Sequence, residues 1–121
     1  MKIALAQLNY HVGNFETNTQ KIISAIKEAQ ENQADLVVFA ELCISGYPAR
    51  DFLEFKEFIA LCENSAKQIA VACQNIACII GLPTVNSSPE GKDLYNSAYF
   101  IENGSIKAVV NKALLPNYDV F

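Results

Sequence analysis

The hydrophobic positions of this chain follow two different periods, and these periods alternate along the sequence. Residues 2–9 alternate apolar and polar side chains, and residues 36–39 and 77–82 are unbroken apolar runs, so all three segments are predicted to be strands. Apolar residues recur at helical spacing through residues 15–29 and again through residues 55–73. The pattern therefore predicts the order strand, helix, strand, helix, strand.

Local signals set the limits of these elements. Asn14 or Thr17 is available as the N-cap of the first helix, and Gln20 completes a possible capping box with Thr17. Pro83 is predicted to end the third strand, because a proline cannot donate a backbone hydrogen bond to a neighbouring strand. The polar stretch 86–93 is predicted to be a loop.

A hairpin follows this loop. Residues 94–102 and 105–111 are predicted strands, and the dipeptide Asn103-Gly104 between them suits a tight turn that requires positive φ angles. Because strands alternate with helices over most of the chain, the fold class is α/β with a largely parallel sheet. Ligands of such sheets bind beyond the carboxyl ends of the strands.

Composition and charge narrow the class of protein. The 121 residues are at most one domain, and 51% apolar with 18% charged residues is ordinary for a globular chain. The net charge is −4 and the nine Lys and Arg residues are scattered, so we expect no nucleic-acid partner. No apolar stretch approaches membrane-spanning length and the amino terminus lacks the pattern of a signal peptide, so we expect a cytoplasmic protein without membrane contact.

The cysteines are predicted to be reduced core residues. Cys62, Cys73 and Cys78 lie on apolar stripes, and the chain shows no secretory context that would favour disulfides. His11 is the only histidine, so we predict no metal site. Cys43 lies two residues after Glu41; in an extended segment the two side chains would point to the same face, which leaves little room for a substrate carbonyl between them.

Two charged residues stand at predicted strand ends. Glu41 follows a buried strand, where a partly desolvated carboxylate can accept and return a proton, although it could simply be the first solvated residue after that strand. Lys112 follows the last strand and is either a surface lysine whose stem covers apolar residues or, beside Glu41, a cation that stabilises developing negative charge. The chain has neither a glycine-rich phosphate loop nor a Gly-x-Ser-x-Gly elbow.

Five segments carry a resemblance that spans nearly the whole chain. They are "ALAQLNYHVGNFETNTQKI" at 4–22, "ADLVVFAELCISGYPARDFL" at 34–53, "GLP" at 81–83, "YNSAYFIENG" at 95–104 and "NKALLPNYDVF" at 111–121. These segments resemble the carbon-nitrogen hydrolase (nitrilase) superfamily, and more narrowly the amino-terminal glutaminase domains of the glutamine-dependent NAD synthetase branch. "GYPARDFL" after Glu41 and "KALLPNYDVF" around Lys112 favour that branch over general amidases.

The resemblance implies a Cys-Glu-Lys triad that hydrolyses an amide. Glu41 would be the general base and Lys112 the cation that stabilises the tetrahedral intermediate. Tyr47 and Tyr118 resemble residues that line the pocket for L-glutamine or its entrance. The glutaminase step needs no cofactor, whereas the ammonia would pass to a synthetase domain that uses ATP and magnesium to amidate nicotinic acid adenine dinucleotide.

The sequence departs from the family in one respect that matters. The family's nucleophilic cysteine lies on a later strand that this chain does not contain, so residues 1–121 are expected to be the amino-terminal part of a glutaminase domain, truncated and inactive alone. The family fold is a four-layer α-β-β-α sandwich, of which this chain would form the amino-terminal half. An uncovered sheet face would then favour self-association into a homo-oligomer.

Two other interpretations remain open. One is a free-standing aliphatic amidase of the same superfamily. The other is a non-catalytic, flavodoxin-like α/β module that binds a partner.

Overall fold

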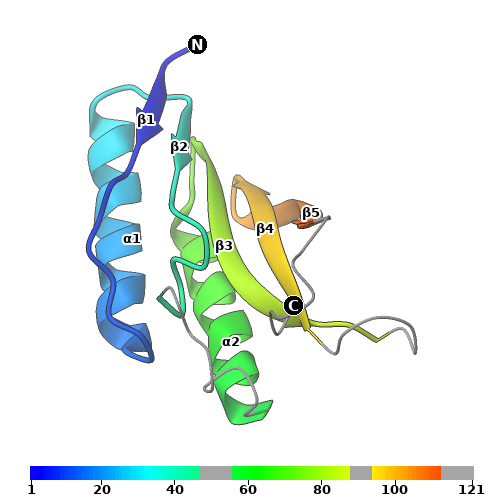
Figure 1. Ribbon diagram of the computed structural model, residues 1–121. Helices are drawn as coiled ribbons and strands as arrows, with labels where there is room; N and C mark the ends of the chain where they lie inside the picture. The colour runs from blue at the N-terminus through cyan, green and yellow to red at the C-terminus, as the bar shows by residue number, and fades with distance from the viewer. Residues whose placement is uncertain (47–55, 88–93, 113–121) are drawn as a thin grey trace.

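The computed structural model describes residues 1–46, 56–87 and 94–112 (Figure 1). One mixed sheet and two helices make up this part of the chain, with both helices on the same face of the sheet, behind it in the view of Figure 1. In chain order the elements are β1 (Ile3–Leu5), α1 (Phe15–Glu31), β2 (Leu36–Val38), α2 (Lys56–Ala72), β3 (Ala77–Val85), β4 (Leu94–Glu102) and β5 (Ser105–Asn111).

The sheet is less parallel than the sequence predicts. Its strands lie in sequence order, with β1, β2 and β3 paired in parallel and β3, β4 and β5 paired antiparallel. The prediction of a largely parallel sheet is therefore wrong for β4. The reason is that β3 and β4 are joined by a short connection, residues 86–93, which is too short to hold the helical crossover that a parallel pair needs.

The first helix begins at Asn14. The Asn14 side chain accepts a hydrogen bond from the backbone N–H of Thr17 at 3.1 Å, which satisfies one of the free N–H groups of the first turn. Asn14 is thus the N-cap, and Thr17 lies inside the helix rather than capping it. The Asn103-Gly104 turn is also confirmed, because both residues have positive φ angles, 48° and 84°.

Strand boundaries differ most from expectation. The strand predicted over residues 2–9 is only Ile3–Leu5, and β3 continues through Pro83 to Val85 instead of ending at the proline. Pro83 is tolerated because β2 pairs with β3 only as far as Ile79, so the later part of β3 has no partner on that side among the described strands.

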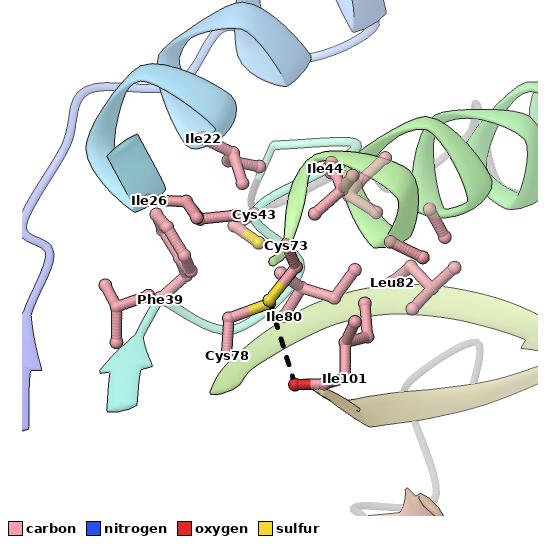
Figure 2. Close-up of a cluster of buried hydrophobic side chains, with 14 of the residues drawn as sticks. Ile22, Ile26, Phe39, Cys43, Ile44, Cys73, Cys78, Ile80, Leu82 and Ile101 are labelled. Carbon is pink, nitrogen blue, oxygen red and sulfur yellow. Dashed lines mark hydrogen bonds between the residues drawn. The ribbon is translucent and has the colours of Figure 1, made fainter. Parts of the chain in front are cut away.

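The core lies between the sheet and the two helices (Figure 2). All four cysteines are free and buried in this part of the molecule, which confirms that they are core residues. Cys73 Sγ lies 3.9 Å from the carbonyl oxygen of Ile101, the contact drawn in Figure 2. The largest fully buried side chains include Ile22, Ile26, Leu42, Ile44, Ile69, Ile80, Leu82 and Ile101.

The opposite face of the sheet exposes apolar side chains at its β1 edge. Ile3 and Leu5 are exposed, whereas Ala4 between them packs against the core, as the alternation of a strand requires. The described residues thus form one helix layer and one sheet layer, with an uncovered apolar edge. Within these residues, no helix is both long and apolar enough to cross a membrane.

Replacing Gly81 with alanine is expected to destabilise the chain by about 1–3 kcal/mol. A Cβ atom at Gly81 would lie 2.6 Å from the backbone nitrogen of Leu42, so β3 and the 41–46 segment would have to separate. Urea unfolding measures the change as a lower midpoint. The control is Ala108→Val on the exposed strand β5, expected within about 0.5 kcal/mol of wild type. A Gly81→Ala midpoint equal to that of wild type would contradict this close approach.

Self-association through the uncovered face is expected to depend on Leu5, which is 73% exposed. In sedimentation velocity the 121-residue chain should sediment above its monomer mass of 13.3 kDa, and Leu5→Lys should shift it toward the monomer, because a buried lysine charge is costly in an apolar contact. Val71→Lys, at an exposed site on α2, is the matched control and should leave the distribution unchanged. A monomeric wild-type chain at all concentrations would contradict the expectation.

Candidate active site

Glu41 stands at the start of a tight turn beyond the end of β2. Leu42 and Gly46 both have positive φ angles, 52° and 84°, and the Gly46 N–H donates to the carbonyl of Leu42 at 2.8 Å. The Ile44 N–H donates to the carbonyl of Gly81 in β3 at 3.2 Å. The segment after Glu41 is therefore folded back on β3 and not extended.

Helix α1 holds the same turn from the other side. Asn18 is fully buried, and its Nδ2 donates to the carbonyl oxygens of His11 and Ile44 at 2.8 and 3.1 Å. Its Oδ1 accepts a hydrogen bond from the backbone N–H of His11 at 3.0 Å. A buried amide with three hydrogen bonds fixes its neighbours firmly, because each group left unpaired would carry a desolvation penalty.

Lys112 follows β5 and lies at the same end of the sheet as Glu41, the end at which β2 stops. Strand β4 runs antiparallel to β3, and β5 runs antiparallel to β4, so β5 is again parallel to β1, β2 and β3. The carboxyl ends of β2 and β5 consequently lie at the same end of the sheet. The Lys112 backbone N–H donates to the carbonyl of Asn96 in β4 at 2.8 Å, which anchors the lysine just past its strand.

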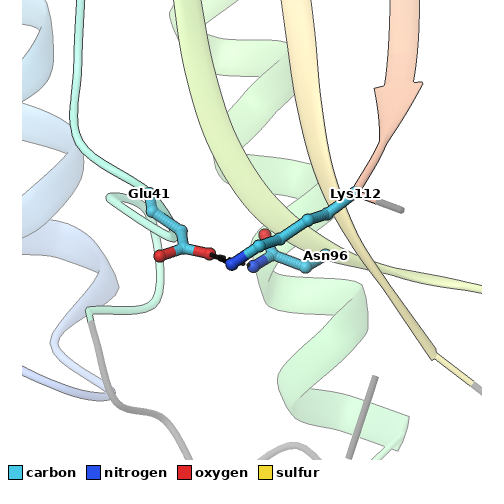
Figure 3. Close-up of polar contacts among 3 residues, drawn as sticks. All are labelled: Glu41, Asn96 and Lys112. Atoms are coloured by element: carbon cyan, nitrogen blue, oxygen red, sulfur yellow. Dashed lines mark hydrogen bonds and ion pairs between the residues drawn. The ribbon is translucent and has the colours of Figure 1, made fainter. Parts of the chain in front are cut away.

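Glu41, Lys112 and Asn96 meet at this end of the sheet (Figure 3). Lys112 Nζ lies 2.8 Å from Glu41 Oε1, and Asn96 Nδ2 donates to the same oxygen at 2.5 Å. Figure 3 shows the lysine side chain extending toward Glu41 in front of the strands, with α2 behind them. The two charges lie 71 positions apart in the sequence and are brought together only by the sheet.

The pair is open to solvent. The side chains of Lys112 and Glu41 are 52% and 42% exposed, so Glu41 is less desolvated than its place after an apolar strand suggests. An exposed ion pair typically contributes only about 0–1 kcal/mol to stability. The arrangement is thus better understood as a positioned carboxylate and cation, able to exchange a proton and to stabilise negative charge, than as a stabilising contact.

Cys43 points away from this pair. Its side chain is fully buried in the core, where its Sγ lies 3.7 Å from the carbonyl oxygen of Gly81. Burial raises the pKa of the Cys43 thiol to about 12, which disfavours the nucleophilic thiolate. The prediction that the Glu41 and Cys43 side chains point to the same face is wrong, because the segment after Glu41 forms a turn and is not extended. The Cys43 thiol is buried in the core, whereas the Glu41 carboxylate is partly exposed to solvent.

The other predicted site residues, Tyr47 and Tyr118, cannot be compared with the structure, and one neighbour of Glu41, Asn96, was not predicted from the sequence. Tyr47 and Tyr118 lie outside the described residues, so their place in a substrate pocket stays a prediction. The sequence did not indicate the contact of Asn96 with Glu41: Asn96 lies in the segment "YNSAYFIENG", but no local pattern marks an asparagine as a neighbour of a residue 55 positions away. Among the described residues, no cluster of three or more His, Cys, Asp or Glu side chains could hold a metal ion.

The family model for carbon-nitrogen hydrolases matches residues 2–119. The chain belongs to the carbon-nitrogen hydrolase family. This membership covers the two helices, all five strands and both charged residues of the site.

Similar proteins point to one branch of this family. A glutamine-dependent NAD(+) synthetase from Xanthomonas campestris is 40% identical over 122 residues, which is all of this chain and 21% of that protein. The crystal structure of a glutamine-dependent NAD(+) synthetase from Cytophaga hutchinsonii superposes with a TM-score of 0.87 at 30% identity, over 95% of this chain and 19% of that one. The chain thus spans about a fifth of the length of these relatives.

An amidase also resembles this chain, with a lower sequence identity and a lower TM-score than the synthetase. The structure of an amidase from Nesterenkonia sp. superposes with a TM-score of 0.77 at 26% identity, over 97% of this chain and 44% of that chain. The amidase fits less well than the synthetases, both in identity and in superposition.

The buried thiols of Cys43 and Cys62 are expected to be nearly inert in the folded chain. With its pKa at about 12, as burial also gives Cys62, the Cys43 thiol should react with iodoacetamide at pH 8 about 1,000-fold more slowly than an ordinary exposed cysteine. Mass spectrometry of native and guanidine-unfolded protein after timed alkylation measures the difference; the unfolded chain, with all four thiols labelled, is the control. Rapid labelling of Cys43 in the folded chain would contradict its burial.

Proposed function

We propose that this chain carries the general base and the charge-stabilising lysine of a glutamine amidohydrolase that supplies ammonia for NAD synthesis. The single observation that carries the proposal is the 2.8 Å contact between Lys112 Nζ and Glu41 Oε1 at the carboxyl ends of β2 and β5. Family membership and the similarity to glutamine-dependent NAD(+) synthetases support the choice of reaction.

The proposed chemistry assigns one role to each charge. Glu41 takes the proton of a cysteine thiol, and the resulting thiolate attacks the side-chain carbonyl carbon of L-glutamine. Lys112 stabilises the negative charge that develops on the tetrahedral intermediate. Glu41 then returns the proton to the departing ammonia, and water releases glutamate from the thioester.

The thiol itself is proposed to come from polypeptide outside this sequence. All four cysteines of this sequence are free and buried in the core, whereas the Glu41 side chain is partly exposed. Without that thiol the 121 residues cannot form the thioester, so they are expected to be inactive alone. In this proposal ATP and magnesium act in a synthetase domain that is also outside this sequence, and no residue described here is assigned to either.

Two alternatives make different predictions. A free-standing aliphatic amidase would use the same charged pair on short amides without coupling to NAD formation. A flavodoxin-like binding module would have a parallel sheet in the order 2-1-3-4-5, whereas this sheet is mixed and runs in sequence order. We therefore retain the amidase as the second candidate, since an amidase is among the structural neighbours.

The test is glutamine hydrolysis by the complete product of the gene that encodes this chain. We expect glutamate and ammonia, with ATP-dependent formation of NAD from nicotinic acid adenine dinucleotide. Glu41→Gln should lower kcat by about 10²- to 10⁴-fold, because the general base is lost. Lys112→Met should lower it by about 10²- to 10³-fold, because a stabilising charge is lost.

Matched controls separate these effects from a general loss of charge. Glu63→Gln on α2 and Lys107→Met on β5 remove exposed charges that are not part of the Glu41–Lys112 pair and should keep wild-type kcat. Hydrolysis of short aliphatic amides without NAD formation would favour the amidase. No amide hydrolysis at all, or equal losses in the control variants, would overturn the proposal.

A further inference from the structure

Asn96 touches both charged residues of the site, each through a different part of the residue. Its side-chain Nδ2 donates to Glu41 Oε1 at 2.5 Å, and its backbone carbonyl accepts the N–H of Lys112 at 2.8 Å. Asn96 belongs to β4, Glu41 to the turn after β2, and Lys112 to the end of β5. One residue therefore joins three segments that the sequence keeps far apart.

The surroundings of Asn96 make its side chain rigid. Asn96 is 7% exposed, and its backbone is held in β4 between β3, where its partner is Pro83, and the end of β5. Glu41, in contrast, is 42% exposed on the side chain, so water alone would let its carboxylate adopt several orientations. A buried amide donor against an exposed carboxylate thus transmits the rigidity of the sheet to the carboxylate through a charge-assisted hydrogen bond.

Both donors bind the same oxygen of the Glu41 carboxylate, and this determines which oxygen is available for proton transfer. Asn96 Nδ2 and Lys112 Nζ both donate to Oε1, and Figure 3 shows the second carboxylate oxygen of Glu41 directed away from these two nitrogen atoms. With Oε1 held by two donors, the carboxylate plane is fixed and Oε2 is the oxygen directed to exchange a proton. Misplacing a reacting group by about 1 Å can cost about 100-fold in rate, so fixing one carboxylate orientation has a large effect.

We propose that Asn96 is a positioning residue for the amide-hydrolysing site: its side-chain amide holds the Glu41 carboxylate so that Oε2 faces the reacting thiol and the departing ammonia. The assignment rests on the proposed amidohydrolase function and adds a residue to it. Asn96 acts through Glu41 and is not itself assigned a contact with the substrate.

The test compares three variants in the complete product of the gene that encodes this chain. Asn96→Ala removes the donor, and Asn96→Asp keeps the size of the side chain but replaces the donor with a carboxylate. Thr84→Val is the matched control, because it removes a buried 2.7 Å hydrogen bond between β3 and β4, from Thr84 to Ser97, without touching Glu41. Unfolding midpoints of all three show whether the variants are folded.

Positioning predicts a specific split of the kinetic constants. Asn96→Ala should lower kcat for glutamine by about 100-fold and leave KM within about 3-fold, because the carboxylate is misoriented while the substrate pocket is kept. Asn96→Asp should lose at least as much, since a second carboxylate then faces Glu41. Thr84→Val should keep wild-type kcat at an equal or lower unfolding midpoint.

The outcomes distinguish the two levels of the proposal. If the wild-type product hydrolyses no amide, the proposed function fails. If the wild type is active and Asn96→Ala keeps its kcat, or loses no more than Thr84→Val at the same stability, the positioning role is overturned and Asn96 is a structural residue of β4. A crystal structure of Asn96→Ala gives a readout independent of turnover: the role requires the Glu41 carboxylate to rotate away from its wild-type orientation, and an unchanged carboxylate would overturn it.

Discussion

The contact between Glu41 and Lys112 depends on a sheet whose chain direction reverses twice. Strand β4 is antiparallel to β3, and β5 is antiparallel to β4, so β5 ends at the same end of the sheet as β2. With only one reversal of direction, the lysine would lie at the opposite end of the sheet, about a strand length from Glu41. The hairpin at Asn103-Gly104 is thus as much a requirement of the site as the charged residues themselves.

Stability and chemistry are separated in this arrangement. The charged pair is half-exposed and contributes little to folding, whereas the groups that place it are buried: Asn18 behind the turn, Gly81 beneath it and Asn96 beside it. Because these supports are buried and hydrogen-bonded, the site has a fixed geometry without relying on its own charges for stability. The buried thiols belong to this supporting core and not to the chemistry.

The elements that the sequence predicts well are those defined by local interactions. Both helices follow from a 3.6-residue apolar period, and the hairpin follows from a dipeptide that adopts positive φ angles. The start of α1 follows from two N-cap candidates, Asn14 and Thr17, of which the structure uses Asn14. The two strands of the hairpin, residues 94–102 and 105–111, begin and end where the apolar pattern places them. Glu41 and Lys112 could be named as candidates because each follows an apolar strand and stands in a segment typical of a known family.

Tertiary structure alone decided the features that depend on distant neighbours. Pro83 continues β3 because β2 stops short beside it, the segment after Glu41 turns and is hydrogen-bonded to Gly81, and Asn96 reaches Glu41 across β3. The sequence by itself therefore determined the helices and the hairpin, since local periodicity, caps and turn residues encode them. It named Glu41 and Lys112 only as candidates, through their places after apolar strands and the family resemblance. The mixed sheet, the orientation of Cys43 into the core and the contact of Asn96 with Glu41 were decided by packing between segments, which no local pattern records.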